Sequence, residues 1–307
     1  MATSSNAAAL EQHALRPDAT GLQKLRRGLV RFCRTKPLGA FGAVVVIMLV
    51  AMAFFPGIFS TQDPNPSPPP LAERYQGPSA SHWFGTDSFG RDMYTRLVYG
   101  ARTSITIGFG VVFISSILAA FLGVVSGYFG GWADMLIQRL VDIGIALPGL
   151  IFIILVVTTL QDLPVTLRII MPVGVLIALG SSRVIRGAAI SAKQNQYVEA
   201  ARVIGATDSR IIARHVLPNV MAVVIVGASI QIGGAVLIES ALSYLGYGIP
   251  PPTPSWGRML NESRQQLSNY PHLVIFPTLA IFMTVYSFNM LGDALRDVLD
   301  PRLRGSR

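Results

Sequence analysis

The chain has 307 residues, of which 51% are hydrophobic and 13% are charged, and its mean hydropathy is +0.50. These values exceed those of an ordinary soluble domain, so they exclude a water-soluble globular protein and predict an integral membrane protein. The net charge of +9 fits nucleic-acid binding, but Lys and Arg in loops beside apolar runs also orient a membrane protein. The single cysteine, Cys33, excludes an internal disulfide bond and a multi-cysteine metal site.

The amino-terminal region, residues 1–37, begins polar and turns basic in the stretch GLQKLRRGLVRFCRTK. This pattern predicts a cytoplasmic basic arm that ends in a short amphipathic helix at the membrane surface. The next stretch, 38–59, is an apolar run long enough to cross a bilayer. It is too long for the core of a signal peptide and lies too far from the start, so we predict an uncleaved first transmembrane helix.

Residues 60–102 form a predicted extracytoplasmic loop, which contains DPNPSPPP and then the polar stretch HWFGTDSFGRDMYTRLVYGART. In it, Asp87, Arg91 and Asp92 stand beside two glycines and resemble a turn that binds phosphate or a metal. Two carboxylates and one arginine are too few to indicate a metal site. We therefore expect a structural turn that caps the following helix, with external docking of a partner as the alternative.

Five more apolar runs follow in the predicted transmembrane core, residues 103–292, and bring the total to six spans. They lie at 104–128, 135–160, 167–185, 220–237 and 272–288. Pro148, followed by Gly149, predicts a bend in the third span. Arg139 and Asp142 stand three residues apart, so we expect an ion pair between them at the membrane boundary.

Six spans place both termini on one side of the membrane, and 18 of the 25 Lys and Arg residues fall on that side. The positive-inside rule therefore predicts cytoplasmic termini, including a tail at 293–307. It also makes 186–219 a cytoplasmic loop and 239–271 an extracytoplasmic loop. This distribution explains the positive net charge without nucleic acid.

The fifth span carries polar and small side chains together, with Ser229 and Gln231 among Gly227, Gly233 and Gly234. Polar side chains in a membrane are costly unless they line water, a substrate or a partner, so this face could border a transport pathway. Ser229 and Gly233 also form a small-xxx-small pair, which equally indicates helix packing. Glu239 ends the span, either near a pathway entrance or as a boundary anchor. Trp256, in a proline-rich stretch, is expected to anchor a short external helix at the interface.

The cytoplasmic loop contains the basic stretch VEAARVIGATDSRIIARHVLPN. Glu199 to Ala201 favour a helix, Gly205 can end it in the left-handed conformation, and Thr207 or Asp208 can cap a second helix that stops at Pro218. A DNA-binding helix-turn-helix has the same order of elements. That motif needs a third helix to form a core, and the loop leaves little room for one. A docking element for a soluble partner fits better.

Four segments resemble ABC importer permeases. The spacing of Glu199-Ala200-Ala201, Gly205 and Leu217-Pro218 resembles their coupling loop, with one departure at His215. The external stretch 82–104, ALSYLGYGIPPPTPSWGRML (241–260) and FNMLGDALRDVLDPRLR (288–304) resemble the second permease subunit of dipeptide, oligopeptide, nickel and glutathione importers. The resemblance covers nearly everything from residue 38 onward.

This resemblance implies an all-α membrane fold of the type I importer permease class, with six transmembrane helices and a cytoplasmic coupling helix, in a bacterial cytoplasmic (inner) membrane. It implies three kinds of protein partner besides the lipid bilayer: a second six-span permease in a heterodimer, two cytoplasmic ATPase subunits and an extracytoplasmic substrate-binding protein. The coupling residues would be Glu199, Ala200, Ala201, Gly205, Leu217 and Pro218, the pathway residues Ser229, Gln231 and Glu239, and the external docking residues Asp87, Arg91, Asp92 and Trp256.

The chain has no GxxxxGK[ST] phosphate loop, so we expect a non-catalytic subunit without cofactors, whose partners bind ATP and Mg²⁺. The four histidines lie in different segments and predict neither a metal site nor a catalytic pair. We expect di- or oligopeptides as cargo, with nickel or glutathione as alternatives. A proton-coupled transporter that acts alone through Asp142 or Glu239 would show inverted repeats and midplane charges, neither of which we find.

Overall fold

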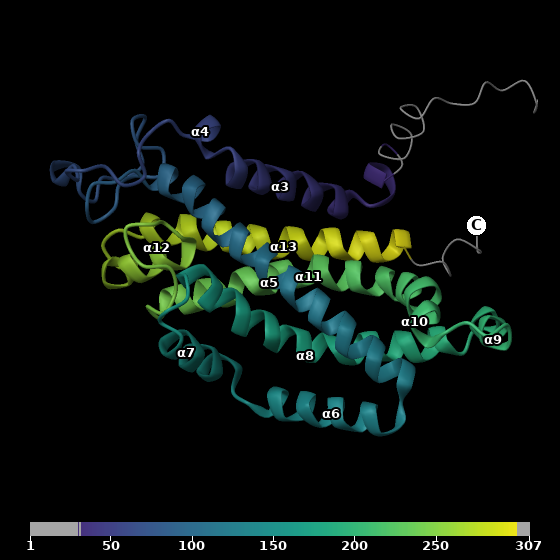
Figure 1. Cartoon of the computed structure of the whole chain (residues 1–307). Helices are drawn as coiled ribbons and strands as arrows, with labels where there is room; N and C mark the ends of the chain where they lie inside the picture. Colours follow the sequence, from purple (N-terminus) through teal and green to yellow (C-terminus); the bar gives the residue numbers. More distant parts are fainter. Residues whose placement is uncertain (1–29, 31, 300–307) are drawn as a thin grey trace, which may run out of the picture.

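The computed structural model describes residue 30 and residues 32–299, and it is a bundle of long helices (Figure 1). The long helices are α3 (Pro37–Phe54), α5 (Met93–Phe129), α8 (Val165–Lys193), α11 (Leu217–Tyr244) and α13 (His272–Leu299). Shorter elements connect them: α4 (Pro56–Phe59), η1 (Leu71–Glu73), α6 (Gly131–Ala146), α7 (Gly149–Thr159), α9 (Gln196–Val203), α10 (Asp208–Ile211), η2 (Ile212–Val216), α12 (Trp256–Ser263) and η3 (Arg264–Gln266). Within the described ranges no β-strand occurs, which confirms the all-α prediction.

Five helices of the described chain are long and apolar enough to cross a membrane. The sixth predicted span is a bent pair, because α6 and α7 meet at an angle of 91°. The break falls at Leu147 and Pro148, and Pro148 precedes the first residue of α7. A proline has no N–H to donate and disfavours a helical residue before it, so the predicted bend at Pro148 is confirmed.

The limits of the second and sixth spans differ from those expected. The helix expected at the end of the external loop is continuous with the second span, because Asp92 caps α5 and no breaker follows it. The sixth span likewise continues to Leu299 instead of ending near 288. The amphipathic helix expected within 1–37 lies largely outside the described residues, as does most of the predicted tail.

The predicted ion pair between Arg139 and Asp142 is wrong. Asp142 of α6 instead pairs with Arg183 of α8. A second pair nearby joins the same two helices, because the guanidinium of Arg186 donates from Nε to Asp134 over 2.7 Å. Local spacing therefore identified a charged boundary but assigned the wrong partner.

Helix α5 packs most extensively against α8, and two glycines allow this close approach. A Cβ added to Gly123 would lie 2.7 Å from the carbonyl oxygen of Ser182, and one added to Gly127 would lie 2.7 Å from that of Arg186. The two glycines are four residues apart, so they share one face of α5, as in small-xxx-small packing between membrane helices. This contact holds the last turns of α5 against α8, at the end of the bundle that carries α9 and α10.

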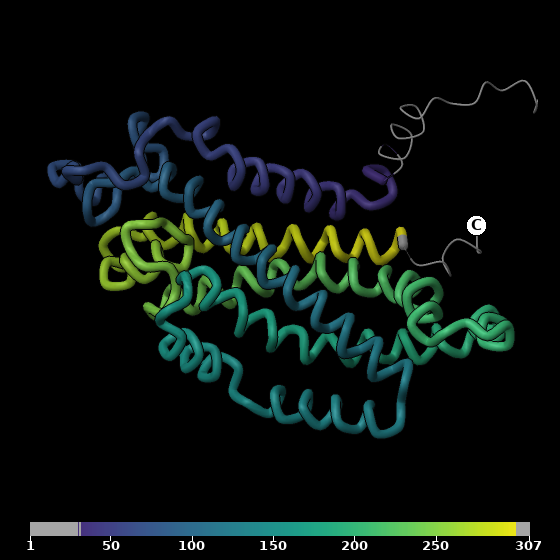
Figure 2. Tube along the Cα trace, in the orientation of Figure 1, coloured from purple at the N-terminus to yellow at the C-terminus, as the bar shows by residue number. Residues whose placement is uncertain are grey.

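The bundle has two distinct ends (Figures 1 and 2). The start of α3 and the end of α13 lie at the same end as α9 and α10. The loop after α4 and the helix α12 lie at the opposite end. The predicted loops thus separate in space as the six-span topology requires.

Replacement of Gly123 by Leu should lower the stability of the folded chain by about 1–3 kcal/mol or more, because the side chain cannot fit between α5 and α8. Thermal unfolding in a mild detergent would measure the loss. Gly180→Ala is the matched control, since nothing lies within 4 Å of a Cβ at Gly180 of α8. Equal melting temperatures for Gly123→Leu and the unaltered chain would contradict the packing account.

Candidate functional site

The predicted cytoplasmic loop, 186–219, is shorter than expected, because α8 continues to Lys193 and α11 begins at Leu217. The coupling segment between them folds as a short helix, a turn and a second short helix. Helix α9 contains Glu199 to Ala201, and Gly205 follows with φ +82°, in the left-handed region where glycine is favoured. Thr207 occupies the position before α10, although its side chain makes no capping hydrogen bond. The predicted local conformation is confirmed, while the coupling role of these residues remains a prediction.

The second helix does not stop at Pro218, contrary to expectation. After α10 the chain continues through the π-helical turn η2 into α11, which gives one helical stretch from Asp208 to Tyr244. Pro218 lies in the first turn of α11. A proline removes one backbone donor, and the wider turn before it accommodates that loss without a break. Leu217 and Pro218 therefore mark a junction inside a helix.

The coupling segment presents an exposed apolar surface. Val203 and Ile204 are 87% and 84% exposed, and Glu199 and Ala200 are exposed on the same short helix and turn. Ala201, in contrast, is buried with Val198 against the bundle. The sequence analysis did not single out Val203 and Ile204. The signal that could have identified them is an apolar Val-Ile pair within a basic stretch. Exposed apolar side chains of this size indicate a contact surface.

Polar contacts attach this segment to the end of α5. The hydroxyl of Tyr128 donates to a carboxylate oxygen of Asp208 over 2.5 Å, and Lys193 Nζ donates to the carbonyl oxygen of Tyr128 over 2.5 Å. Tyr128 is itself buried. A hydrogen bond with the Tyr128 hydroxyl also raises the pKa of Arg202. These contacts fix the orientation of α10 relative to α5 and α8.

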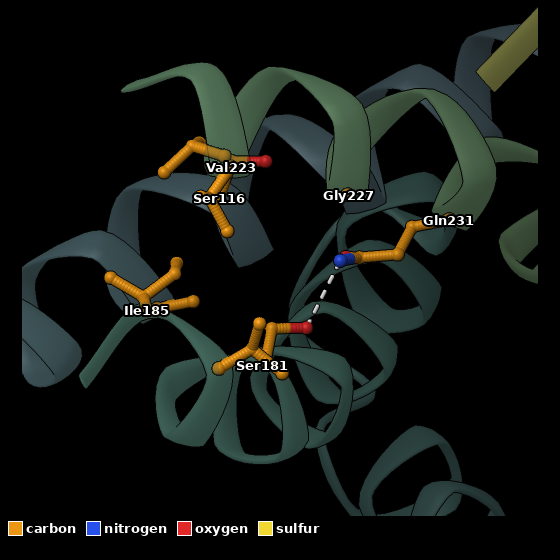
Figure 3. Close-up of a pocket in the computed structure, with 9 residues that line it drawn as sticks. Ser116, Ser181, Ile185, Val223, Gly227 and Gln231 are labelled. Carbon is orange, nitrogen blue, oxygen red and sulfur yellow. Dashed lines mark hydrogen bonds between the residues drawn. The ribbon is translucent and has the colours of Figure 1, made fainter. Parts of the chain in front are cut away.

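A small cavity of about 90 Å³ lies between α5, α8 and α11 (Figure 3). Six of its lining residues are Ser116, Ser181, Ile185, Val223, Gly227 and Gln231. The side-chain amide of Gln231 donates from Nε2 to Ser181 Oγ over 3.0 Å, and its Oε1 accepts from Ser115 Oγ over 3.2 Å. One amide therefore joins three helices.

The three predicted pathway residues do not converge on this cavity. Only Gln231 lines it. The hydroxyl of Ser229 donates to the carbonyl oxygen of Ile225 in its own helix over 2.9 Å. Glu239 is fully buried and accepts hydrogen bonds from Ser104 over 3.0 Å and from Ser243 over 2.7 Å. Its position favours an anchor between helices, and its pathway role remains a prediction.

The packing alternative holds for Gly233, because a Cβ there would lie 3.1 Å from the Cα of Val285 in α13. This part of α11 therefore packs against a helix of the same chain. Ser115 and Ser181, which bond Gln231, were missed by sequence reasoning. They lie 116 and 50 residues from it, and nothing local in the sequence connects them.

At the opposite end, a buried group of charged residues joins the external loop to α12. Arg91 binds Asp87 through Nε over 2.7 Å and Glu262 over 3.0 Å. Arg96, only 1% exposed, binds the same oxygen of Glu262 over 3.1 Å. Arg258 binds the other oxygen of Glu262 over 3.1 Å. We call these five residues the external clamp.

Asp92 caps α5, as expected of a structural turn, because its carboxylate accepts from the backbone N–H of Thr95 over 2.7 Å. Trp256 does not lie at a membrane interface, contrary to expectation. It is fully buried, and its Nε1 donates to the carbonyl oxygen of Leu97 over 3.0 Å. Asp87, Arg91 and Trp256 are buried, so they do not offer a surface to a partner. A docking role for this region remains a prediction, and exposed residues nearby would have to make the contacts.

Replacement of Glu262 by Ala should destabilise the external end by about 3–5 kcal/mol, because the two buried arginines, Arg91 and Arg96, then share only Asp87 and the half-buried Arg258 loses its partner. Limited proteolysis of α12 and its flanking loops should become faster. Glu73→Ala is the control, since Glu73 is largely exposed and meets His82 at 3.5 Å, a contact worth about 1 kcal/mol or less. Unchanged proteolysis of Glu262→Ala would contradict the clamp.

Replacement of Tyr128 by Phe should loosen the coupling segment, because Asp208 loses its hydrogen bond. Hydrogen exchange of the backbone amides in α9 and α10 should become about tenfold faster, as expected for the loss of one hydrogen bond that opposes local opening. Tyr244→Phe, at the far end of α11, should leave these amides unchanged. Equal exchange in both variants would show that the contact does not hold the segment.

Comparisons with known proteins agree with this arrangement. Residues 119–305 match the family described as binding-protein-dependent transport system inner membrane component. The dipeptide transport system permease protein DppC of Alkalihalophilus pseudofirmus is 39% identical over 270 residues, which are 87% of this chain and 86% of that protein. The glutathione transport system permease protein GsiD of Pectobacterium atrosepticum is 38% identical over 281 residues, covering 89% and 90% of the two chains.

The fold also matches a crystal structure of an amino acid ABC transporter with histidines. The TM-score is 0.52 at 14% sequence identity, and the match covers 66% of this chain and 94% of the other. At this identity the likeness shows a shared fold alone. The family match and the two relatives together cover the spans, the coupling segment and the external clamp. The chain therefore belongs to the binding-protein-dependent transport system inner membrane component family and is a non-catalytic, multi-pass permease subunit of an ABC importer.

Proposed function

We propose that this subunit forms half of a translocation pathway for di- or oligopeptides in a bacterial cytoplasmic membrane. The observation that carries the proposal is the exposed end of the coupling segment, where Val203, Ile204 and Glu199 offer an apolar and charged surface. A surface of this kind needs a partner, and the helices that leave it, α8 and α11, enter the membrane directly. The subunit thus has a place to receive a mechanical input and two helices to pass it on.

The proposed assembly contains a second six-span permease, two cytoplasmic ATPase subunits that bind ATP and Mg²⁺, and an extracytoplasmic substrate-binding protein. The absence of a phosphate loop from this sequence supports the division of labour. The basic residues support a cytoplasmic location for both termini and for α9 and α10. The common end shared by α3, α9, α10 and α13 is consistent with that topology (Figure 1).

The cargo proposal rests on the names of the relatives, one a dipeptide and the other a glutathione permease. Both solutes contain peptide bonds, so we take a small solute with peptide bonds as the cargo class. Glutathione is the alternative within this class, and nickel is the alternative outside it. No contact in the structure favours a proton-coupled transporter, because Asp142 is paired with Arg183 and the buried Glu239 is bonded to serines.

Replacement of Glu199 by Arg should reduce peptide uptake by about tenfold or more while the chain still inserts, because a reversed charge at a docking surface opposes binding of the partner. Uptake of a labelled peptide and recovery of ATPase subunits with the affinity-tagged chain would both be measured in cells. Asp162→Arg makes the same charge change in the exposed turn after α7 and should leave both readouts unchanged. Normal uptake by Glu199→Arg would count against the coupling assignment.

A further inference from the structure

The cavity between α5, α8 and α11 combines two features that structural packing does not require. Its amide and hydroxyl groups lie inside membrane-crossing helices, where polar groups are retained for a reason. It also opens at the bundle surface, because Val184 on its rim is 64% exposed. A polar hollow that opens sideways in a membrane is stabilised by water, a partner or cargo, since lipid tails offer no hydrogen bonds.

Two of the three walls of this cavity, α8 and α11, are the helices that flank the coupling segment. Helix α8 ends at Lys193, three residues before α9 begins, and α11 follows α10 without a break. A displacement of α9 and α10 therefore acts on both walls directly. The hydrogen bond between Gln231 of α11 and Ser181 of α8 crosses the gap between these walls (Figure 3). Separation of the walls must break it.

The chemistry of Gln231 matches a peptide bond. A primary amide donates and accepts at neighbouring atoms, and a peptide bond does the same. In this structure both functions of Gln231 are occupied by serine hydroxyls, Ser181 as acceptor and Ser115 as donor. When α8 and α11 separate, Ser181 is drawn away from Gln231, and the amide can pair with a passing backbone in its place. At about 90 Å³ the cavity has room for a few water molecules and excludes a peptide in the present state.

The cavity lining also selects against a bare metal ion. None of the described residues that line it is charged, and none is an imidazole, thiolate or carboxylate ligand. Neutral hydrogen-bonding groups suit a cargo whose side chains vary but whose backbone amides do not. Since serine hydroxyls and a peptide bond are both neutral hydrogen-bonding partners of the Gln231 amide, the site can release the cargo as readily as it accepts it.

We infer that Gln231, with Ser115 and Ser181, forms a hydrogen-bonding position at which the backbone of an amide-bearing cargo is handed through the pathway. This inference rests on the proposed function and extends it in two ways. It assigns a pathway site to three helices, and it places peptides and glutathione within the cargo class while a bare metal cation lies outside it.

The test uses the whole complex, purified through this chain from its native membranes and reconstituted in vesicles with its binding protein. The probes are labelled tri-L-alanine, glutathione and Ni²⁺, and the readout is cargo transported per ATP hydrolysed. Gln231→Leu removes the amide at similar size, and Gln231→Glu keeps the shape but adds a negative charge. Thr158→Ala is the control in another membrane helix, since the Thr158 hydroxyl bonds only carbonyl oxygens of its own helix, α7, and does not line the cavity.

The unaltered complex should carry tri-alanine or glutathione and not Ni²⁺. Gln231→Leu should lower transport per ATP by about tenfold or more, as the loss of a hydrogen bond made to cargo in transit predicts, with the complex recovered intact. Gln231→Glu should impair glutathione, a net anion, more than tri-alanine. A purely structural role would not produce that difference. Thr158→Ala should stay within about twofold of the unaltered complex.

Two results would overturn the inference. One is transport by Gln231→Leu within about twofold of the unaltered complex, and the other is transport of Ni²⁺ without either peptide. If the proposed function is wrong, the chain is purified without ATPase subunits. That result is seen at the purification step, before any variant is compared.

Discussion

Backbone groups in a membrane must satisfy one another, and this requirement shapes the path from the coupling segment into the bilayer. The chain from Asp208 to Tyr244 stays helical through Pro218 because the π-helical turn η2 absorbs the missing donor. An unbroken helix transmits a displacement along its axis, whereas a loop would absorb it. Helix α8 provides the second link from the same segment. The account of coupling depends on these two connections.

The two ends of the bundle are built to behave differently. At the external end, the external clamp and the hydrogen bonds of Glu239 to Ser104 and Ser243 tie α5, α11 and α12 together inside the protein. At the other end, buried Val198, Ala201 and Ile211 pack α9 and α10 against the bundle, Tyr128 bonds Asp208, and an apolar surface stays exposed. The close contact of α5 with α8 at Gly123 and Gly127 lies at this same end, beside Tyr128. The external end is thus closed by buried ion pairs, whereas the coupling end keeps a surface for a partner.

Much of the fold could be predicted from the sequence because apolar runs and turn residues act locally. The runs located the long helices, Pro148 located the bend, and the left-handed preference of glycine located the end of α9 at Gly205. Pro218 misled the prediction because a proline can be accommodated by a π turn that sequence patterns do not reveal. A helix boundary drawn at a proline is a local argument, and here backbone satisfaction over the whole span outweighed it.

The candidate site was less accessible to sequence reasoning, because its contacts join distant segments. Gln231 was identified as a polar residue in a span, but Ser115 and Ser181 were not connected to it. Asp142 forms its ion pair with Arg183 of another helix and not with Arg139, three residues away. Trp256 was assigned to an interface from its aromatic character, yet the packing of α12 against α5 buries it. Each of these outcomes is set by helix arrangement, which hydropathy alone does not encode.

The central claim is that the coupling segment moves the walls of the cavity. It can be tested by a distance measurement between spin labels at Val184→Cys on α8 and Val223→Cys on α11, in a chain whose only other cysteine is removed by Cys33→Ser. In the complete complex, the account predicts that this distance changes when ATP binds and that Glu199→Arg abolishes the change. A distance that is the same with and without ATP, or a change that persists in Glu199→Arg, would contradict it.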